Sequence, residues 1–125
     1  MMKGTIILDS LREDASISGF RFVVREIGRG RVKLSPQQVA AGLPPVWSAM
    51  EFELGEERAE ELAKSLSGAL DPIGWYANFS SPTETFFVYP NRVFRYLRGD
   101  SQGRAAAQAH GRTLGIPDHQ LDWSE

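Results

Sequence analysis

The stretch that decides the fold runs from Glu84 to Arg98, with the sequence ETFFVYPNRVFRYLR. Two runs of strand-forming residues flank Pro90-Asn91, which predicts a β-hairpin. Because proline cannot adopt the positive φ of a type I′ turn, we expect a type I turn with a following bulge, which leaves the register open by one residue. The simplest register places Phe87, Tyr89, Arg92, Phe94 and Tyr96 on one face, and Phe86, Val88, Val93, Arg95 and Leu97 on the other. Since both faces are largely apolar, we expect the hairpin at the centre of a sheet, buried on one side by helices and partly covered on the other.

Segments on both sides of the hairpin supply the other elements. Runs of β-branched or alternating apolar residues predict strands at 5–11, 20–27, 46–54 and 75–79. The glycines and arginines of 28–31 are expected to end or bend the second of these strands. One helical turn is expected at 36–41, within a loop over 33–45.

Two helices are predicted by periodicity and capping. After Gly55, apolar residues recur at helical spacing, at Ala59, Leu62, Ala63, Leu66, Ala69 and Leu70. A second helix is expected over 102–114, capped by Gly99-Asp100-Ser101 and stopped by Gly115 and Pro117. The order of elements predicts an α+β fold, with a mainly antiparallel β-sheet of about five or six strands and two helices packed on one face. We expect residues 1–125 to form a single domain.

Composition excludes several classes of protein. The 125 residues are 42% hydrophobic and 24% charged, as in ordinary globular proteins, and include no cysteine. Disulfides, thiolate zinc sites and cysteine nucleophiles are therefore excluded. No apolar run is long enough for a membrane span, and the first one is too short for a signal peptide. The expectation is a soluble cytoplasmic protein with no membrane partner.

Charge is distributed unevenly although the net value is only −2. Residues 21–33 contain five basic residues and one acid, and residues 92–112 show the same excess. Residues 51–61 contain six glutamates and one arginine. This segregation favours an interaction with a charged partner over simple solvation of the surface.

Catalytic and metal-binding motifs find little support. His110 and His119 lie nine positions apart, whereas metal sites on helices use spacings of three or four. Gly28-Arg29-Gly30 lacks the remaining residues of a dinucleotide or phosphate-binding loop, and no nucleophile elbow is present. We assign no catalytic residue, no metal and no cofactor, and we favour a function other than catalysis.

Two clusters are candidate binding sites. The first is acidic and suits a basic protein partner: Glu53, Glu57, Glu60 and Glu61. The second combines arginines with aromatic rings and an amide, as in sheets that hold a nucleotide or single-stranded nucleic acid: Trp75, Tyr76, Asn78, Arg92, Arg95, Tyr96 and Arg98. Alternating arginines and aromatics also arise on any half-exposed strand, where arginine stems cover packed rings.

The C-terminal half resembles a group of small uncharacterised bacterial proteins. The resemblance rests on Gly74 to Phe79, on 84–100, on Leu114 to Pro117 and on Gln120 to Trp123, in the pattern GWYxxF…FVxPxRVFRYxRGD. It covers about half of the chain well and the first half loosely. It implies a bacterial or phage source and a stand-alone domain, and it carries over no activity.

Two functions are consistent with these features. The leading hypothesis is a non-enzymatic protein–protein interaction domain, such as an inhibitor or immunity-type partner that masks a basic protein with its acidic cluster. The alternative is a binder of a small ligand, a nucleotide or single-stranded nucleic acid that uses the arginine and aromatic surface. A homodimer through a free sheet edge and Trp47 is a further expectation.

Overall fold

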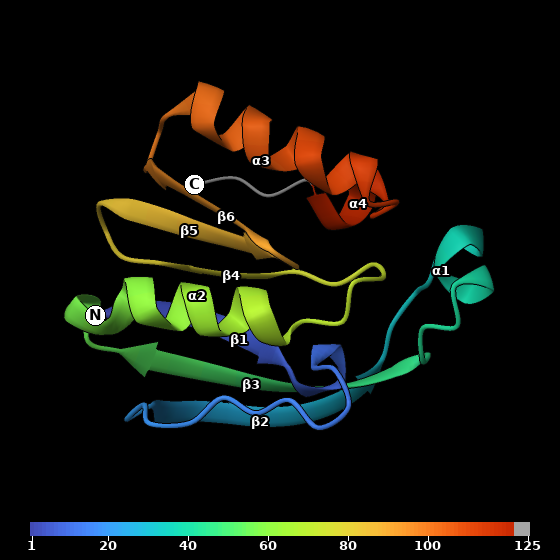
Figure 1. Cartoon of the computed structure of the whole chain (residues 1–125), viewed down its shortest axis with the longest axis horizontal. Coiled ribbons are helices and arrows are strands. Elements are labelled where there is room, and N and C mark those ends of the chain that lie inside the picture. The colour runs from blue at the N-terminus through green and yellow to red at the C-terminus, as the bar shows by residue number, and fades with distance from the viewer. Residues whose placement is uncertain (122–125) are drawn as a thin grey trace.

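The computed structural model describes residues 1–121 as a six-stranded antiparallel sheet with helices on both faces (Figure 1). The strands follow the spatial order β2-β3-β1-β4-β5-β6. Their bounds are β1 Met2–Ile7, β2 Val23–Arg31, β3 Val46–Leu54, β4 Ala77–Ser80, β5 Glu84–Tyr89 and β6 Arg92–Leu97. The α+β class and the antiparallel sheet are confirmed.

Strand β1 lies in the middle of the sheet, paired with β3 on one side and β4 on the other. It begins three residues earlier than predicted, because Met2 is fully buried in the core. It also ends earlier, because the hydroxyl of Ser10 donates to the carbonyl of Ile7 and helps to close a 3-10 turn over Leu8–Ser10.

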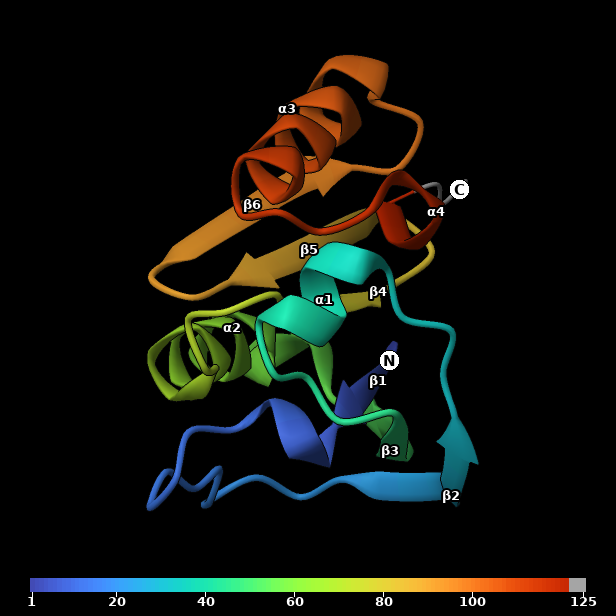
Figure 2. The ribbon, with the colours of Figure 1, turned by 90° about the vertical axis from the view of Figure 1, so that its right-hand side faces the viewer.

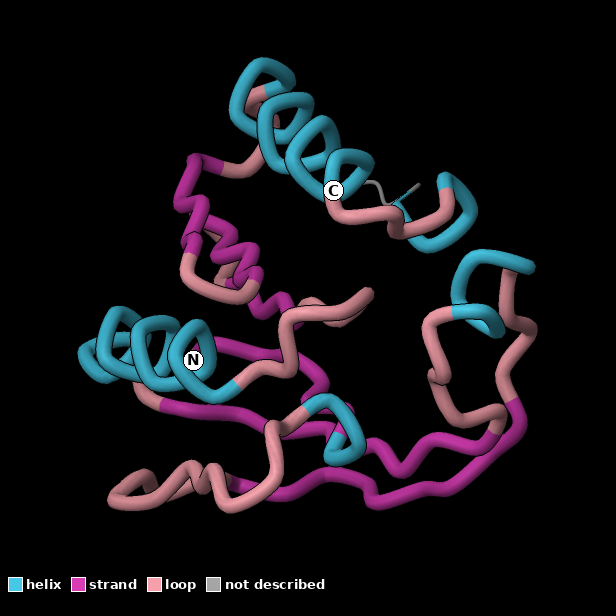
Figure 3. The backbone as a smooth tube through the Cα atoms, turned by 45° about the vertical axis from the view of Figure 1, so that its right-hand side comes forward, coloured by secondary structure: helices cyan, strands magenta, loops and turns pink. Residues whose placement is uncertain are grey.

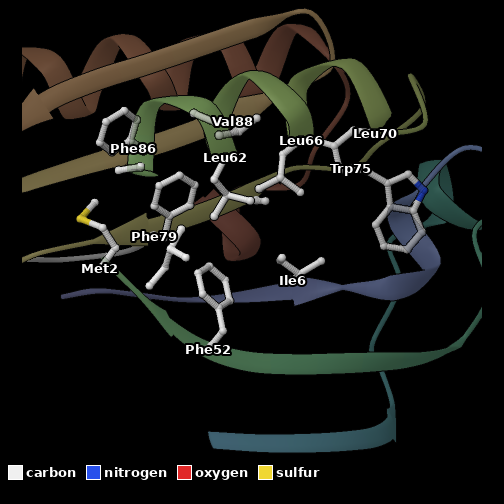
Figure 4. Close-up of a cluster of buried hydrophobic side chains, with 14 of the residues drawn as sticks. Met2, Ile6, Phe52, Leu62, Leu66, Leu70, Trp75, Phe79, Phe86 and Val88 are labelled. Atoms are coloured by element: carbon white, nitrogen blue, oxygen red, sulfur yellow. The ribbon is translucent and has the colours of Figure 1, made fainter. Parts of the chain in front are cut away.

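Helix α2, Ala59–Ala69, covers one face of the sheet after a 3-10 turn at Glu56–Arg58. Its buried residues are those of the predicted apolar stripe, and Leu62 and Leu66 are fully buried. They pack on rings that the strands project toward the helix, among them Phe52, Phe79 and Phe86 (Figure 4). Because Phe79 and Phe86 stack with their ring centroids 5.1 Å apart, β4 and β5 are joined by ring contacts as well as by backbone hydrogen bonds.

Helix α3, Ser101–Thr113, covers the opposite face. Asp100 caps it by accepting from the backbone N–H groups of Gln102 and Gly103, each at 3.1 Å. The helix packs over Phe87 and Tyr89, and the Tyr89 hydroxyl donates to the carbonyl of Ala107 at 2.6 Å.

The expectation that both helices pack on one face therefore does not hold. Consecutive residues of a strand point to opposite faces. Phe86 and Val88 lie in the α2 core, and Phe87 and Tyr89 lie in the α3 core. Figure 2 shows β5 and β6 between the two helices. The side chains of β5 alternate between the two faces of the sheet, and nearly all of them are apolar. A helix must therefore pack on each face.

The hairpin adopts the simplest register, with Tyr89 opposite Arg92. The predicted type I turn with a bulge is wrong. Pro90 and Asn91 form a two-residue turn in which Asn91, at φ 60°, supplies the positive φ that proline cannot. The turn is held by α2, since the N–H of Asn91 donates to the Ser67 carbonyl at 3.0 Å. The hairpin also lies at the edge of the sheet, with β6 outermost, and not at its centre.

Two short helices meet at the end of the sheet where β2 turns back into β3 (Figure 3). They are α1, Pro36–Ala40, and α4, Asp118–Leu121. Ser35 forms a capping box with Gln38, and Gln38 is almost fully buried. The side-chain amides of Gln38 and Gln120 bond to each other at 3.1 and 3.3 Å, which ties α1 to α4.

Strand β2 forms the other edge, and all nine of its residues are exposed. It continues through Gly28 to Arg31, where the sequence predicted an end or a bend. A shift of register between Val24 and Glu26 marks a bulge at Arg25. Within residues 1–121, no helix is long and apolar enough to cross a membrane.

Two strand glycines give a matched test of how tightly the sheet centre is packed. A Cβ added to Gly4 of β1 would lie 2.5 Å from Cβ of Phe79, whereas a Cβ on Gly28 of β2 would meet nothing within 4 Å. We expect Gly4→Ala to lower the free energy of unfolding by roughly 1–3 kcal/mol, and Gly28→Ala to leave it unchanged or slightly raised. Urea denaturation measures the free energy of unfolding of both variants, and equal stability would contradict a close contact between Gly4 and Phe79.

Candidate functional site

The structure divides the arginines of the predicted ligand surface between two faces. Arg95 lies on the α2 side, where it pairs with Glu84 through bonds of 2.9 and 3.1 Å; this pairing raises the pKa of Arg95. Arg92 lies on the α3 side, over the ring of Phe94. Arg98, at the end of the hairpin, donates to the carbonyl of Ser81 at 3.2 Å.

Tyr96 is also unavailable as a stacking platform. It is 7% exposed, and Gly103 of α3 lies directly over it, so that a Cβ on that glycine would stand 2.5 Å from the Tyr96 Cβ. The ring of Tyr96 is therefore buried beneath α3 and cannot stack on a ligand. The hairpin therefore does not form a single surface of arginine and aromatic side chains.

The other three residues of the predicted ligand set come together. Trp75, Tyr76 and Asn78 line one cavity of about 200 Å³ on the α3 side of the sheet. Thr5 of β1, Trp47 of β3 and Gln120 of α4 also line it, and every lining side chain is uncharged. On this face, α3 and α4 cover one part of the sheet and leave the other part exposed. The cavity lies at the boundary between these two parts.

Hydrogen bonds and ring contacts fix the aromatic walls of this cavity. Trp47 packs against Trp75 with ring centroids 4.7 Å apart, and its indole N–H donates to the Pro44 carbonyl at 2.7 Å. Tyr76 stacks on Phe87 at 5.0 Å, and its hydroxyl donates to the Gln120 carbonyl at 2.6 Å. Burial raises the pKa of Tyr76 to about 12. The walls are thus held in place without a ligand.

Two polar side chains on the floor have no such bonds. Thr5 of β1 and Asn78 of β4 are register partners, so their side chains stand next to each other on the same face. Within residues 1–121, neither the Thr5 hydroxyl nor the Asn78 amide forms a hydrogen bond to the protein. Both groups face the cavity, and both can donate and accept.

A charged groove continues from the cavity at Thr5. It has a volume of about 410 Å³ and is lined by Lys3, Arg25, Glu51 and Glu53. Glu53 forms ion pairs with Lys3 at 3.4 Å and with Arg25 at 3.3 Å, and 15% of its side chain is exposed. The two cations are balanced by two glutamates, so this groove has no excess of positive charge.

The predicted acidic site is divided in the same way. Glu53 lies in the groove, on the face opposite α2, whereas the other three glutamates lie on the exposed side of α2 and its preceding turn. Of these, Glu60 pairs with Lys64 at 3.9 Å and Glu61 with Arg58 at 3.0 Å. Glu57 alone of the three has no such ion pair within residues 1–121.

The two histidines do not form a site together. His110 packs edge-on against Tyr89, with ring centroids 4.9 Å apart, and burial together with the charge of Arg92 lowers its pKa. His119 lies on α4, in a separate hollow near Arg112. No group of three or more potential metal ligands occurs in the part of the chain that the structure describes.

The sequence did not point to the group of three exposed apolar side chains on the edge strand β2. Val23, Val24 and Ile27 are 45%, 46% and 69% exposed. The backbone of 23–31 makes its hydrogen bonds to β3, and within residues 1–121 no other backbone bond reaches it. The alternation of 20–27 indicated a strand, but a strand's position at an edge depends on which segments pair with it.

No protein-family model, no curated protein and no solved structure matches this chain.

Ionisation of Tyr76 provides a test of the cavity wall. Its pKa in the folded protein, about 12, lies above the ordinary 10.0, so the folded state keeps the phenol neutral where the unfolded chain ionises. The stabilisation is complete below pH 10 and disappears as the pH rises to about 12. We expect the free energy of unfolding to fall over this interval, with Tyr76 contributing up to about 2 kcal/mol of the fall.

Tyr76→Phe is the matched variant for this measurement. It keeps the ring stacked on Phe87 and removes the ionisable hydroxyl. Urea titrations at pH 9.5 and pH 11 should show a smaller difference between the two pH values for the variant than for the unsubstituted protein. Equal pH dependence in the two proteins would contradict a buried, neutral Tyr76.

Proposed function

We propose that this protein is a non-enzymatic protein-binding domain whose partner adds an extended segment to the free edge of β2. The observation that carries the proposal is the exposure of all nine residues of this edge strand. An edge strand presents a row of unpaired N–H and C=O groups, which can pair with a strand from another chain.

Side chains on β2 support a partner that is partly apolar. Val24 and Ile27 project from the same face of the strand as Phe52 and Met50, with which they pair. They extend that apolar face beyond the part that α2 and the segment before β2 cover. A partner strand with apolar residues on this face would bury them.

Charge indicates the chemistry of the other side chains of the partner. Strand β2 contains Arg25, Arg29 and Arg31 against the single acid Glu26. An antiparallel pair of two β2 strands centred on Gly30 would set Arg29 opposite Arg31, and a pair centred on Arg29 would set that arginine opposite its own copy; Arg29 and Arg31 share one face of the strand. Like charges directly opposite each other are destabilising. A partner segment with glutamate or aspartate at these positions is favoured over a second copy of β2.

The acidic surface of α2 offers weaker support for a basic partner. Two of its glutamates, Glu60 and Glu61, are already paired with cations of the same helix and turn. A basic protein would have to compete with Lys64 and Arg58 for them.

The non-enzymatic assignment is supported by the role of the buried hydroxyls, because those of Tyr76 and Tyr89 are bonded to backbone carbonyls in the packed interior.

The two edges of the sheet provide a matched pair of variants. Ile27 on β2 is 69% exposed, and Leu97 on the opposite edge strand β6 is 68% exposed. Ile27, Arg29 and Arg31 project from the same face of β2. The probe is an eight-residue peptide of valine and threonine that places valine opposite Ile27 and glutamate opposite Arg29 and Arg31. Its counterpart with lysine in place of each glutamate is the control. We expect the acidic peptide to bind, and Ile27→Asp to weaken its binding by about tenfold, which corresponds to about 1.4 kcal/mol.

Isothermal titration calorimetry measures these affinities, and backbone NMR shifts locate the bound peptide. Leu97→Asp should change the affinity by less than about twofold. Binding of the lysine peptide at the same strength, or equal effects of the two substitutions, would contradict a partner that adds to β2.

A further inference from the structure

The cavity between β1, β3, β4 and α4 has the features of a built ligand site that is separate from the β2 edge. Its volume is about 200 Å³. An apolar cavity of about 150 Å³ in a protein interior is large enough to hold benzene. A planar group of one or two fused rings therefore fits this cavity, and a larger molecule would extend out of it toward the groove.

The walls favour a flat ligand. Strand β1 lies between β3 and β4, so Trp47 of β3 and Tyr76, directly before β4, stand on opposite sides of the floor that β1 forms. Both rings are fixed by contacts with the protein: Trp47 by Trp75 and the Pro44 carbonyl, and Tyr76 by Phe87 and the Gln120 carbonyl. Rigid aromatic walls bind planar groups at little entropic cost.

The floor favours a ligand with an adjacent hydrogen-bond donor and acceptor. Asn78 offers a carboxamide, with an N–H donor beside a C=O acceptor, and Thr5 next to it offers a hydroxyl. Polar side chains that are not bonded within the protein are available to water or to a ligand. Here the two neighbouring side chains form no hydrogen bond to the protein in the part of the chain that the structure describes. An asparagine amide pairs bidentately with one edge of adenine, through an N–H of the base and its neighbouring ring nitrogen.

The charges favour a neutral ligand. None of the residues that line the cavity is ionised. In the neighbouring groove, Lys3 and Arg25 face Glu51 and Glu53, so the groove offers a phosphate no excess of positive charge. A nucleobase or nucleoside fits this environment better than a nucleotide does.

We infer that the cavity binds a neutral planar heterocycle of nucleobase size, which stacks between Trp47 and Tyr76 and pairs through its edge with Asn78 and Thr5. This inference does not depend on the proposed function of β2. It retains three residues of the ligand surface that the sequence suggested, Trp75, Tyr76 and Asn78, without the arginines.

Adenine and adenosine are the probes, and AMP, 7-deazaadenine and indole are the comparisons. Saturable binding is measured by isothermal titration calorimetry and by ligand-observed NMR on the full chain. We expect adenine to bind more tightly than 7-deazaadenine, which lacks one acceptor of the paired edge, and adenosine to bind at least as tightly as AMP. Indole should bind about tenfold more weakly than adenine, because it has no acceptor for the Asn78 amide.

Three variants test the assignment of the floor. Asn78→Leu keeps the approximate volume and removes the amide, and we expect it to weaken adenine binding by at least about tenfold. Thr5→Val removes only the hydroxyl and should weaken binding by about threefold or more. Ser80→Ala, on the same face of β4 but outside the cavity, should leave the affinity within about twofold.

Several outcomes would overturn the inference. The first is that adenine shows no saturable binding at concentrations up to about 1 mM. The second is that indole binds as tightly as adenine. The third is that both Asn78→Leu and Thr5→Val bind adenine with unchanged affinity. Thermal unfolding of each variant shows whether it is folded, and Thr5→Val serves as the decisive variant if Asn78→Leu is not. Because none of these substitutions is on β2, the acidic peptide should still bind to each variant, which separates the two proposals.

Discussion

Strand β5 imposes the main constraint on this structure, because every residue from Thr85 to Tyr89 is buried. Phe86 and Val88 point to one face, and Phe87 and Tyr89 point to the other. Each face must therefore be covered, and one helix cannot cover both. Helix α2 covers the first and α3 the second, and their positions in turn fix the hairpin turn, the helix caps and the path of the chain toward α4.

The two halves of the sheet are covered unequally as a result. Helix α3 runs along β6 and is followed by α4, so the cover of that face ends above β4. Beyond it, β1 and β3 are partly open and β2 is exposed throughout. The uncharged cavity lies at this boundary, where the rings of Trp47 and Tyr76 border the floor. The free edge lies at the far end of the same sheet, so both proposed sites follow from the same arrangement.

Charge follows this division as well. The basic segment identified in the sequence forms the edge strand β2, and most of the acidic segment forms the exposed side of α2. Glu51 and Glu53 are exceptions, because they lie on β3 and line the groove on the face opposite α2, where Glu53 pairs with Lys3 and Arg25. Of the remaining glutamates, Glu60 and Glu61 pair with Lys64 and Arg58, and Glu56 pairs with the N-terminal amine. The basic edge is thus a more complete recognition surface than the acidic helix, although the sequence made the two look equivalent.

Local patterns in the sequence were sufficient to predict whether each main segment forms a strand or a helix. Alternation gave the strand Val46–Leu54 to the residue, helical spacing gave the buried stripe of α2, and Asp100 and Gly115 marked the ends of α3 closely. These features depend on backbone geometry and on neighbours within one turn or one strand. The α+β class and the antiparallel sheet followed from the order of the elements.

The tertiary structure alone decided which residues meet. Strand order placed the hairpin at an edge and β1 at the centre, and no local pattern contains that information because strand pairing joins segments far apart in the chain. Alternation separated Arg92 from Arg95, and the close approach of α3 at Gly103 buried Tyr96. Thr5 and Asn78, 73 positions apart, became neighbours only because β1 pairs with β4. By itself the sequence determined the elements and their amphipathic faces, whereas the sites depend on the packing of those faces against one another.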